Sequence, residues 1–252
     1  MNRWRRDFLH RALQGAGLIV LAGCDKLYET ETFQAILNTA ESADRSIQRL
    51  LTPKNKLAQE FGVQDISPVF RANGNPAPNT PEYLADAADQ WSAWRLDVNG
   101  LVVQPREFSL AELKTMPSRT QITRHDCVEG WSAIAKWKGV PLARIIERVE
   151  PKAEAKYVVF RCLDTNSRGD YYYESISLED ALHPQTILAY DMNDKPVPVA
   201  NGAPLRLRIE NQLGYKHAKY IRALEFVASF EQIEKGKGGY WEDRGYEWYA
   251  GI

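Results

Sequence analysis

The chain has 252 residues, of which 44% are hydrophobic and 26% charged, the composition of a soluble globular protein with a sizeable core. Lysine and arginine together number 32 and aspartate and glutamate 33, and this balance argues against a general nucleic-acid-binding protein, which would carry a basic excess. The three cysteines, Cys24, Cys127 and Cys162, are too few for a disulfide framework, and their spacing matches no zinc or haem motif.

Residues 1–24 predict a targeting signal rather than a folded element. Arg5 and Arg6 stand in a basic stretch, and the apolar run after them is shorter than the roughly 20 residues that cross a bilayer. The R-R-D-F-L run resembles a twin-arginine export signal, and the L-A-G-C run that ends at Cys24 resembles a bacterial lipobox. The sequence therefore predicts export, cleavage before Cys24 and lipidation of that cysteine. A buried amphipathic N-terminal helix is the alternative.

The next two stretches differ in composition. Residues 25–60 predict a helical spacer, because apolar residues recur at helical spacing between 30 and 51. Residues 52–90 are rich in proline, asparagine and glycine and predict a long irregular loop, of a kind that is often functional. A solvated surface loop without a function is the alternative.

From Trp94 onward, the sequence predicts short strands with helices between them. Alternating residues around Asn99-Gly100 indicate a hairpin, and Ser109 with Glu112 forms a capping box before a helix. Pro141 is predicted at the first position of a further helix, which has an apolar stripe. That stripe consists of Leu142, Ile145, Ile146 and Val149.

Further strands are predicted at six places, with a turn at Asn193-Asp194 and a short helix capped by Ser177. The strands are 121–128, 156–163 with Cys162 at its end, 171–176, 186–192, 203–210 and 219–230. Together these elements predict an α+β domain with a mixed sheet over residues 61–252.

Cys127 has the surroundings of a reactive cysteine. It follows Arg124, His125 and Asp126 and stands two residues before Glu129. Arg124 would favour the thiolate, whereas the two carboxylates would oppose it. A cysteine packed in the core is the alternative, since free cysteine is among the most buried residue types.

The run R-H-D-C-V-E-G-W-S around Cys127, followed by G-V-P-L at 139–142, resembles the metal-ligand segment of the sulfite oxidase family of molybdopterin-binding oxidoreductases. It is most similar to the branch of that family containing the periplasmic methionine sulfoxide reductase catalytic subunit. The resemblance implies a sulfite-oxidase-type fold and a molybdenum-molybdopterin cofactor, with Cys127 as the metal ligand. It also fits the predicted export signal, because the twin-arginine route moves proteins that fold around their cofactor first.

A second segment, N-G-A-P-L-R-L followed by G-Y-K-H-A-K, resembles the part of the family that grips the cofactor phosphate. Phosphate needs donors and positive charge, which arginine, lysine and exposed backbone amides supply. The resemblance extends to Asn73 in the early loop and to Cys162, where the reductase branch has a threonine that lines the cofactor. The cofactor-binding residues implied are Asn73, Cys162, Asn201, Arg206, Lys216, His217, Ala218 and Lys219. A strand with an exposed charged face is the alternative for Arg206 and Arg208.

Three further residues are implied near the metal: Arg71 from the early loop, and Arg244 and Tyr246 from the aromatic C-terminal tail. The tail has two open interpretations, as a flap that packs on the core or as part of a substrate funnel.

Two departures from the family bear on the reaction. Ser132 stands where sulfite oxidases have an arginine for their anionic substrate, and Asp126 stands where the reductase branch has a basic residue. The chain also contains no recognisable haem-binding segment, so the electrons are predicted to come from a separate membrane haem protein or cytochrome.

The sequence thus predicts a periplasmic or cell-surface enzyme that reduces an S-oxide or N-oxide by oxygen-atom transfer. The first alternative is the oxidation of sulfite or another small sulfur compound. The second is an exported binding lipoprotein that has kept the fold and lost the metal.

Overall fold

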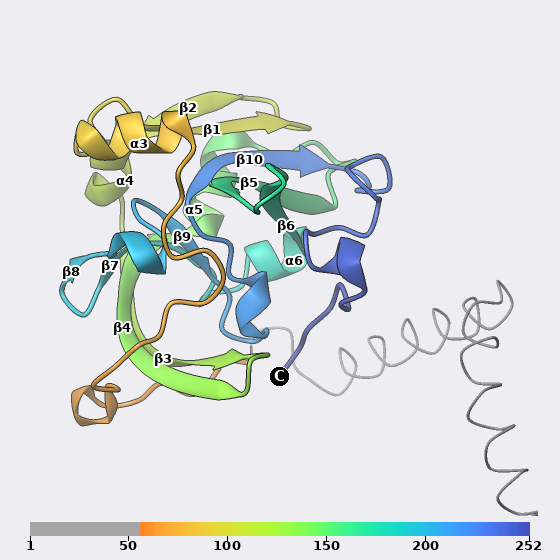
Figure 1. The fold of residues 1–252 in the computed structure, drawn as a ribbon. Coiled ribbons are helices and arrows are strands. Elements are labelled where there is room, and N and C mark those ends of the chain that lie inside the picture. The colour runs from red at the N-terminus through yellow and green to blue at the C-terminus, as the bar shows by residue number, and fades with distance from the viewer. Residues whose placement is uncertain (1–55) are drawn as a thin grey trace, which may run out of the picture. The chain divides into compact units, whose positions relative to one another are not determined.

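The computed structural model describes residues 56–252 (Figure 1). The predicted signal at 1–24 and the greater part of the predicted spacer at 25–60 lie outside these residues, so both remain predictions. Within the described part, no helix is long and apolar enough to cross a membrane.

The described elements alternate short helices with strands, as the pattern from Trp94 onward predicts. The α-helices are α3 (Pro81–Ala88), α4 (Leu110–Thr115), α5 (Leu142–Val149) and α6 (Leu178–Ala181), and the 3-10 helices are η1 (Val63–Asp65), η2 (Val199–Asn201), η3 (Gly214–Lys216) and η4 (Glu242–Arg244). The strands are β1 (Arg95–Gly100), β2 (Arg106–Ser109), β3 (Arg119–Cys127), β4 (Trp131–Pro141), β5 (Tyr157–Thr165), β6 (Tyr171–Ser177), β7 (Ile187–Met192), β8 (Lys195–Pro196), β9 (Arg206–Arg208) and β10 (Ile221–Val227).

The strands form two sheets that enclose a common core. One sheet has the order β2-β1-β10-β5-β6 and is mixed, because β1 and β10 are parallel while its other pairs are antiparallel. The other has the order β3-β4-β7-β8, with β9 also paired to β7. The largest hydrophobic cluster takes side chains from both sheets and from α5, whose four predicted stripe residues are all buried. The α+β prediction with a mixed sheet is therefore confirmed.

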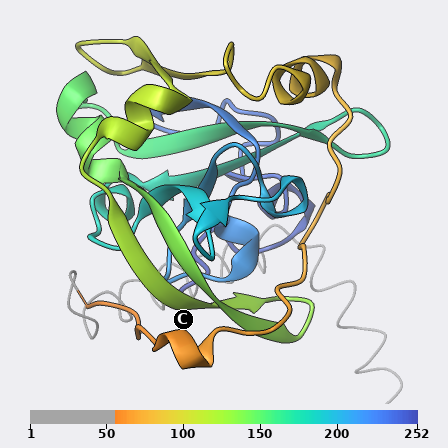
Figure 2. The same cartoon turned by 90° about the vertical axis from the view of Figure 1, so that its left-hand side faces the viewer.

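The long hairpin of β3 and β4 curves down one side of the domain in both views (Figures 1 and 2). Side chains of β4 alternate, so that Ala133, Ala135 and Trp137 are buried. Gly139 lets β7 approach, because a Cβ atom there would lie 2.1 Å from the carbonyl oxygen of Leu188. The sequence pattern predicts the first strand of this hairpin, at 121–128, but not the second strand, β4.

One prediction is wrong for residues 81–88, which form helix α3 rather than the end of a long loop. Thr80 caps the helix through its side-chain oxygen, and Pro81 occupies the first position. Tyr83 is buried and packs edge-on against Tyr220, with ring centroids 5.2 Å apart. This contact with Tyr220, the residue before β10, stabilises helix α3. The composition of the segment did not indicate a helix there. The segment before α3 is largely irregular, as predicted, and runs from the hairpin up to α3 (Figure 2).

Several boundaries also differ from the prediction, and the predicted strands 203–210 and 219–230 are shorter, as β9 and β10. Gly100 belongs to β1, and the connection to β2 lies after it, at residues 101–105. Pro141 ends β4 instead of opening α5, and β5 continues past Cys162 to Thr165. The capping box of Ser109 with Glu112 and the cap at Ser177 are confirmed.

Candidate active site

Cys127 is the last residue of β3, at the turn of the long hairpin. Gly130 closes that turn by donating its amide to the Cys127 carbonyl at 3.0 Å, with a φ of +83° that favours glycine. The Cys127 thiol is half-buried, and burial raises its pKa while the backbone amide of Glu129 opposes the rise. Cys127 and Cys162 are both free cysteines, so neither is tied up in a disulfide.

The charged residues that precede Cys127 in sequence, Arg124 and Asp126, do not face the pocket. Arg124 pairs with Asp126 at 2.9 Å, and Ser132 donates to the other oxygen of Asp126 at 2.5 Å. Neither Asp126 nor Ser132 lines the pocket beside Cys127. This follows from strand alternation, which places Asp126 on the opposite face of β3 from Cys127.

Cys127 opens onto a pocket of about 320 Å³. Its walls come from five separate parts of the chain: the loop before α3, the hairpin turn, the end of β5 with the start of β6, the stretch from η3 to Lys219, and the C-terminal segment, residues 236–252. The lining residues are Asn73, Gly74, Asn75, Cys127, Val128, Glu129, Asp164, Thr165, Asn166, Tyr172, Tyr215, His217, Lys219, Tyr240, Trp241 and Tyr246. The predicted site residues Asn73, Cys127, His217, Lys219 and Tyr246 are thus brought together.

His217 presents an unpaired acceptor to this pocket. Its Nε2 lies 3.0 Å from the Gln212 carbonyl oxygen and must carry the proton, which leaves Nδ1 as a lone pair. Nδ1 is buried and has no partner among the described residues. Burial, followed by the charge of Arg208, holds the pKa of His217 well below its usual range, so the ring is neutral.

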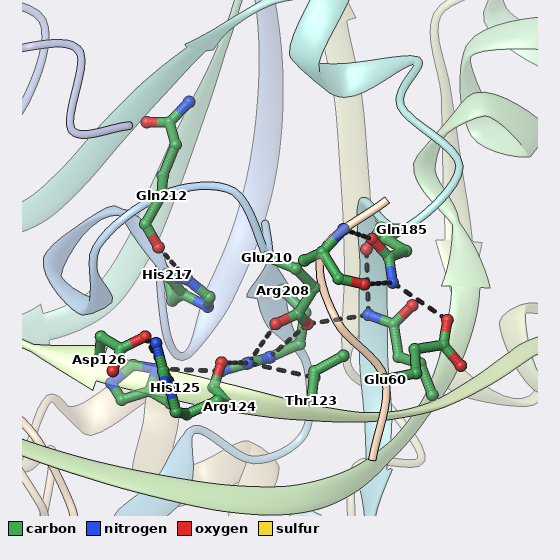
Figure 3. Close-up of polar contacts among 12 residues, drawn as sticks. Glu60, Thr123, Arg124, His125, Asp126, Gln185, Arg208, Glu210, Gln212 and His217 are labelled. Carbon is green, nitrogen blue, oxygen red and sulfur yellow. Dashed lines mark hydrogen bonds and ion pairs between the residues drawn. The ribbon is translucent and has the colours of Figure 1, made fainter. Parts of the chain in front are cut away.

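A buried polar network continues from His217 into the sheet (Figure 3). The His125 ring lies 4.9 Å from that of His217 and accepts from Arg208 at 3.0 Å through Nδ1. Arg208 in turn forms a two-point ion pair with Glu210, at 2.9 and 2.6 Å. The sequence showed Arg208 only as one of two alternating arginines, and its buried partner could not be identified from spacing.

Arg206 and Asn201 form a set of unsatisfied donors. The Arg206 guanidinium is fully buried and donates to the Asn201 carbonyl at 2.7 Å, while its Nε and Nη2 and the Asn201 amide nitrogen have no partner among the described residues. Burial and then Arg208 lower the pKa of Arg206 to about 9, so it remains cationic at neutral pH. Buried donors without acceptors are costly, and an oxyanion such as phosphate would satisfy them.

The lysines of the second segment have different partners. Lys219 donates to the carbonyl oxygens of Asn73, Asn75 and Ala200 at 2.6, 2.7 and 3.1 Å, and so ties the loop before α3 to the pocket. Lys216 does not line the pocket, because its ammonium lies between the carboxylates of Glu174 and Glu242. Its charge is therefore already matched by protein groups.

The other predicted residues lie away from the pocket wall. Ala218 and Cys162 belong to the hydrophobic core, and burial raises the pKa of the Cys162 thiol well above its usual range. Arg71 is exposed. Arg244 pairs with Asp170 at 3.3 Å and lies 3.5 Å above the ring of Tyr240, so it supports a wall residue without reaching the wall.

Several wall residues escaped prediction, among them Asp164, Tyr172, Tyr215 and Tyr240. Tyr172 stands in a stretch whose pattern predicts only a strand, whereas Tyr215 stands within the G-Y-K-H-A-K run that resembles the family but is not itself among the predicted cofactor-binding residues. Asp164 lies two residues after Cys162, in the run R-C-L-D-T-N, where the clustering of polar residues at a strand end was the one available signal.

The chain is similar to a known protein family and to several known proteins. Residues 83–233 match a protein family described as the oxidoreductase molybdopterin-binding domain. The chain is 38% identical over 247 residues, 98% of its length, to a putative protein-methionine-sulfoxide reductase subunit, YedZ1, from Azospira oryzae, of which the match covers 87%.

Two further similarities are shorter. A protein-methionine-sulfoxide reductase catalytic subunit, MsrP, from Xanthomonas axonopodis pv. citri is 40% identical over 146 residues, which is 54% of this chain and 45% of that protein. Among solved structures, the sulfane dehydrogenase SoxCD from Paracoccus pantotrophus has a TM-score of 0.48 and 21% identity, covering 54% of this chain and 38% of that one.

Proposed function

The chain belongs to the molybdopterin-binding oxidoreductase family, and from this membership we propose that it reduces an S-oxide, or an N-oxide, with electrons from a separate protein. The names of two relatives, both called reductase subunits acting on protein methionine sulfoxide, support an S-oxide as the substrate class. Methionine sulfoxide is a neutral group, which matters for the comparison with sulfite below.

The residues present fit a molybdenum-molybdopterin cofactor. Cys127 would supply the thiolate to the metal, and metal binding would displace the proton that burial favours on the thiol. Arg206 and Asn201 would satisfy their free donors on the cofactor phosphate, and Asn73, His217 and Lys219, which line the pocket, would help to hold the cofactor. When bound, the cofactor supplies two-electron oxygen-atom-transfer chemistry, and the protein positions it and limits the access of water.

The composition of the pocket wall is the observation that favours a neutral oxide over an anion as the substrate. None of its residues is an arginine, its two acidic residues are Glu129 and Asp164, and the ammonium of Lys219 is held by backbone carbonyls. Arg71 and Arg244, either of which would provide a charge for an anion, are absent from the wall. An anion such as sulfite would meet carboxylates there, whereas a neutral oxide meets aromatic rings and polar amides.

The test compares both directions on the purified, metal-loaded protein. We expect kcat/KM for a neutral sulfoxide, with a reduced dye as electron donor, to exceed kcat/KM for sulfite with an electron acceptor by at least the factor that one charge-assisted contact provides, about ten- to a hundredfold. Efficient sulfite turnover without sulfoxide reduction would establish sulfite oxidation instead. A protein that binds no molybdenum would favour a binding lipoprotein.

Export and anchoring complete the proposal. The twin-arginine run and the lipobox-like run before Cys24 favour a periplasmic or cell-surface protein anchored by lipid. The relatives' description as subunits supports a separate electron-transfer protein, for which a membrane haem protein or cytochrome is suited.

A further inference from the structure

Asp164 lies where the pairing of β5 with β6 is interrupted. Arg161 pairs with Tyr173 and Thr165 pairs with Tyr171, so residues 162–164 of β5 stand opposite Tyr172 alone. Such bulges redirect side chains and recur beside active sites. Here the bulged residue Asp164 lines the same pocket as Cys127.

The Asp164 carboxyl is buried without a donor on one of its oxygens. It is 6% exposed, and its Oδ1 has no partner among the described residues. Burial raises its pKa to about 6, against the opposing charge of Lys219. The titratable groups that face it are Lys219, Tyr83, Tyr172, Tyr220 and Cys162.

None of these groups prevents the Asp164 carboxyl group from holding a proton. Lys219 directs its ammonium to backbone carbonyls, and burial lowers its pKa to about 7, so its hold on the carboxylate weakens near neutrality. The other carboxyl on the wall, Glu129, is exposed and accepts a hydrogen bond from Trp131 at 2.9 Å. Asp164 alone on this wall combines burial with a free carboxyl oxygen.

We propose that Asp164 is the proton donor of the pocket, delivering a proton to the oxygen that leaves the substrate, an inference that rests on the proposed function. Reduction of an S-oxide breaks the sulfur–oxygen bond, consumes two electrons and two protons, and releases a sulfide and water. The electrons come from the separate reductant through the bound cofactor. The Asp164 O–H bond breaks as a new O–H bond forms, and solvent supplies the second proton and then reprotonates the carboxylate.

The pH dependence has a definite sign. The donor acts in its protonated form, which is present below the pKa of about 6 and is lost as the pH rises through it. Turnover of a neutral sulfoxide should therefore fall up to tenfold for each pH unit above that value.

The experiment compares metal-loaded full-length wild type with Asp164→Asn and Asp164→Glu. Asp164→Asn should lower kcat by about a hundredfold or more at pH 6 and abolish the alkaline fall, because general acids typically contribute 10²- to 10⁴-fold. Asp164→Glu should restore part of the rate and the pH dependence. Asp194→Asn is the matched control. Asp194 is an exposed turn residue in a left-handed conformation that asparagine tolerates, so this substitution should leave kcat and its pH dependence unchanged.

Two measurements distinguish a proton donor from a residue that only anchors the cofactor. Molybdenum and pterin content should stay at wild-type values in Asp164→Asn, and their loss would overturn the proposal in favour of cofactor anchoring. Infrared difference spectroscopy should detect a protonated carboxyl that titrates near pH 6 and is missing from Asp164→Asn. Absence of that band, or unchanged turnover in Asp164→Asn, would refute the role. If wild type reduces no sulfoxide, the proposed function fails, and the infrared titration alone then decides whether Asp164 holds the proton.

Discussion

Cys127 and Cys162 have different surroundings. Cys127 is half-buried beside a pocket whose other walls carry unpaired polar atoms, whereas Cys162 is packed in the hydrophobic core with its sulfur 4.0 Å from the Phe160 carbonyl. A metal ligand needs an open side and a removable proton, and Cys127 alone of the two has the open side.

Replacing Cys127 with serine should therefore reduce the metal content to background and abolish turnover. Cys162→Ser is the matched control. It should retain the metal and lose about 1–3 kcal/mol of unfolding free energy, the cost of burying a hydroxyl group in an apolar site. Elemental analysis, turnover and urea denaturation of both variants provide the comparison. Turnover lost in Cys162→Ser and kept in Cys127→Ser would contradict the assignment.

At the scale of elements, the C-terminal segment is a wall of the pocket and is held by buried charge. It supplies Tyr240, Trp241 and Tyr246 to the lining. Glu242 within it accepts from Lys216 at 2.6 Å, and Glu174 on β6 accepts from the same ammonium. Burial and then Glu242 raise the pKa of Glu174 well above its usual range. The C-terminal segment is thus both held against the domain and part of the pocket wall, so the two interpretations of the tail do not exclude each other.

Lys216→Met should loosen this segment, because it removes the cation from between two buried carboxylates. Breaking a buried ion pair costs about 3–5 kcal/mol, whereas a surface pair contributes about 1 kcal/mol or less. Arg161→Met, which breaks the partly exposed pair with Glu225, is the matched control. We expect urea denaturation to show the large loss only in Lys216→Met.

Limited proteolysis should then cut Lys216→Met within residues 236–252 while sparing the Arg161 variant. Adding Glu174→Gln and Glu242→Gln to Lys216→Met should recover much of the stability by removing the uncompensated charges. Equal stability of the two single variants would show that the buried ion cluster does not hold the segment.

For the whole molecule, the remaining prediction concerns the N-terminal residues. Replacing Arg5 and Arg6 with lysine should leave folded, metal-loaded protein in the cytoplasm, since the twin-arginine route requires the pair. Cys24→Ser should be exported but extracted without detergent, because it cannot be lipidated. Cell fractionation with a metal assay measures both. Normal export of the double variant would exclude the twin-arginine route, and continued membrane retention of Cys24→Ser would exclude a lipid anchor at that residue.

Local patterns in the sequence were sufficient for much of the fold. The capping box at Ser109, the apolar stripe of α5 and the alternation of β3 depend on contacts within a few residues, so they are readable from spacing. The two candidate site segments, around Cys127 and from Asn201 to Lys219, were predicted in a different way, from their resemblance to a known family.

The tertiary structure decided which of those residues face the pocket. Alternation along β3 and β4 turns Asp126 and Ser132 away from Cys127, and a carboxylate pair distant in sequence removes Lys216 from the wall. The bulge in β5 brings Asp164 to the pocket, where the polar residues clustered at the strand end are only a weak signal of it in the sequence. Partners separated by tens of residues determine where a side chain points and how its charge is matched, and such partners are fixed only when the sheets pack.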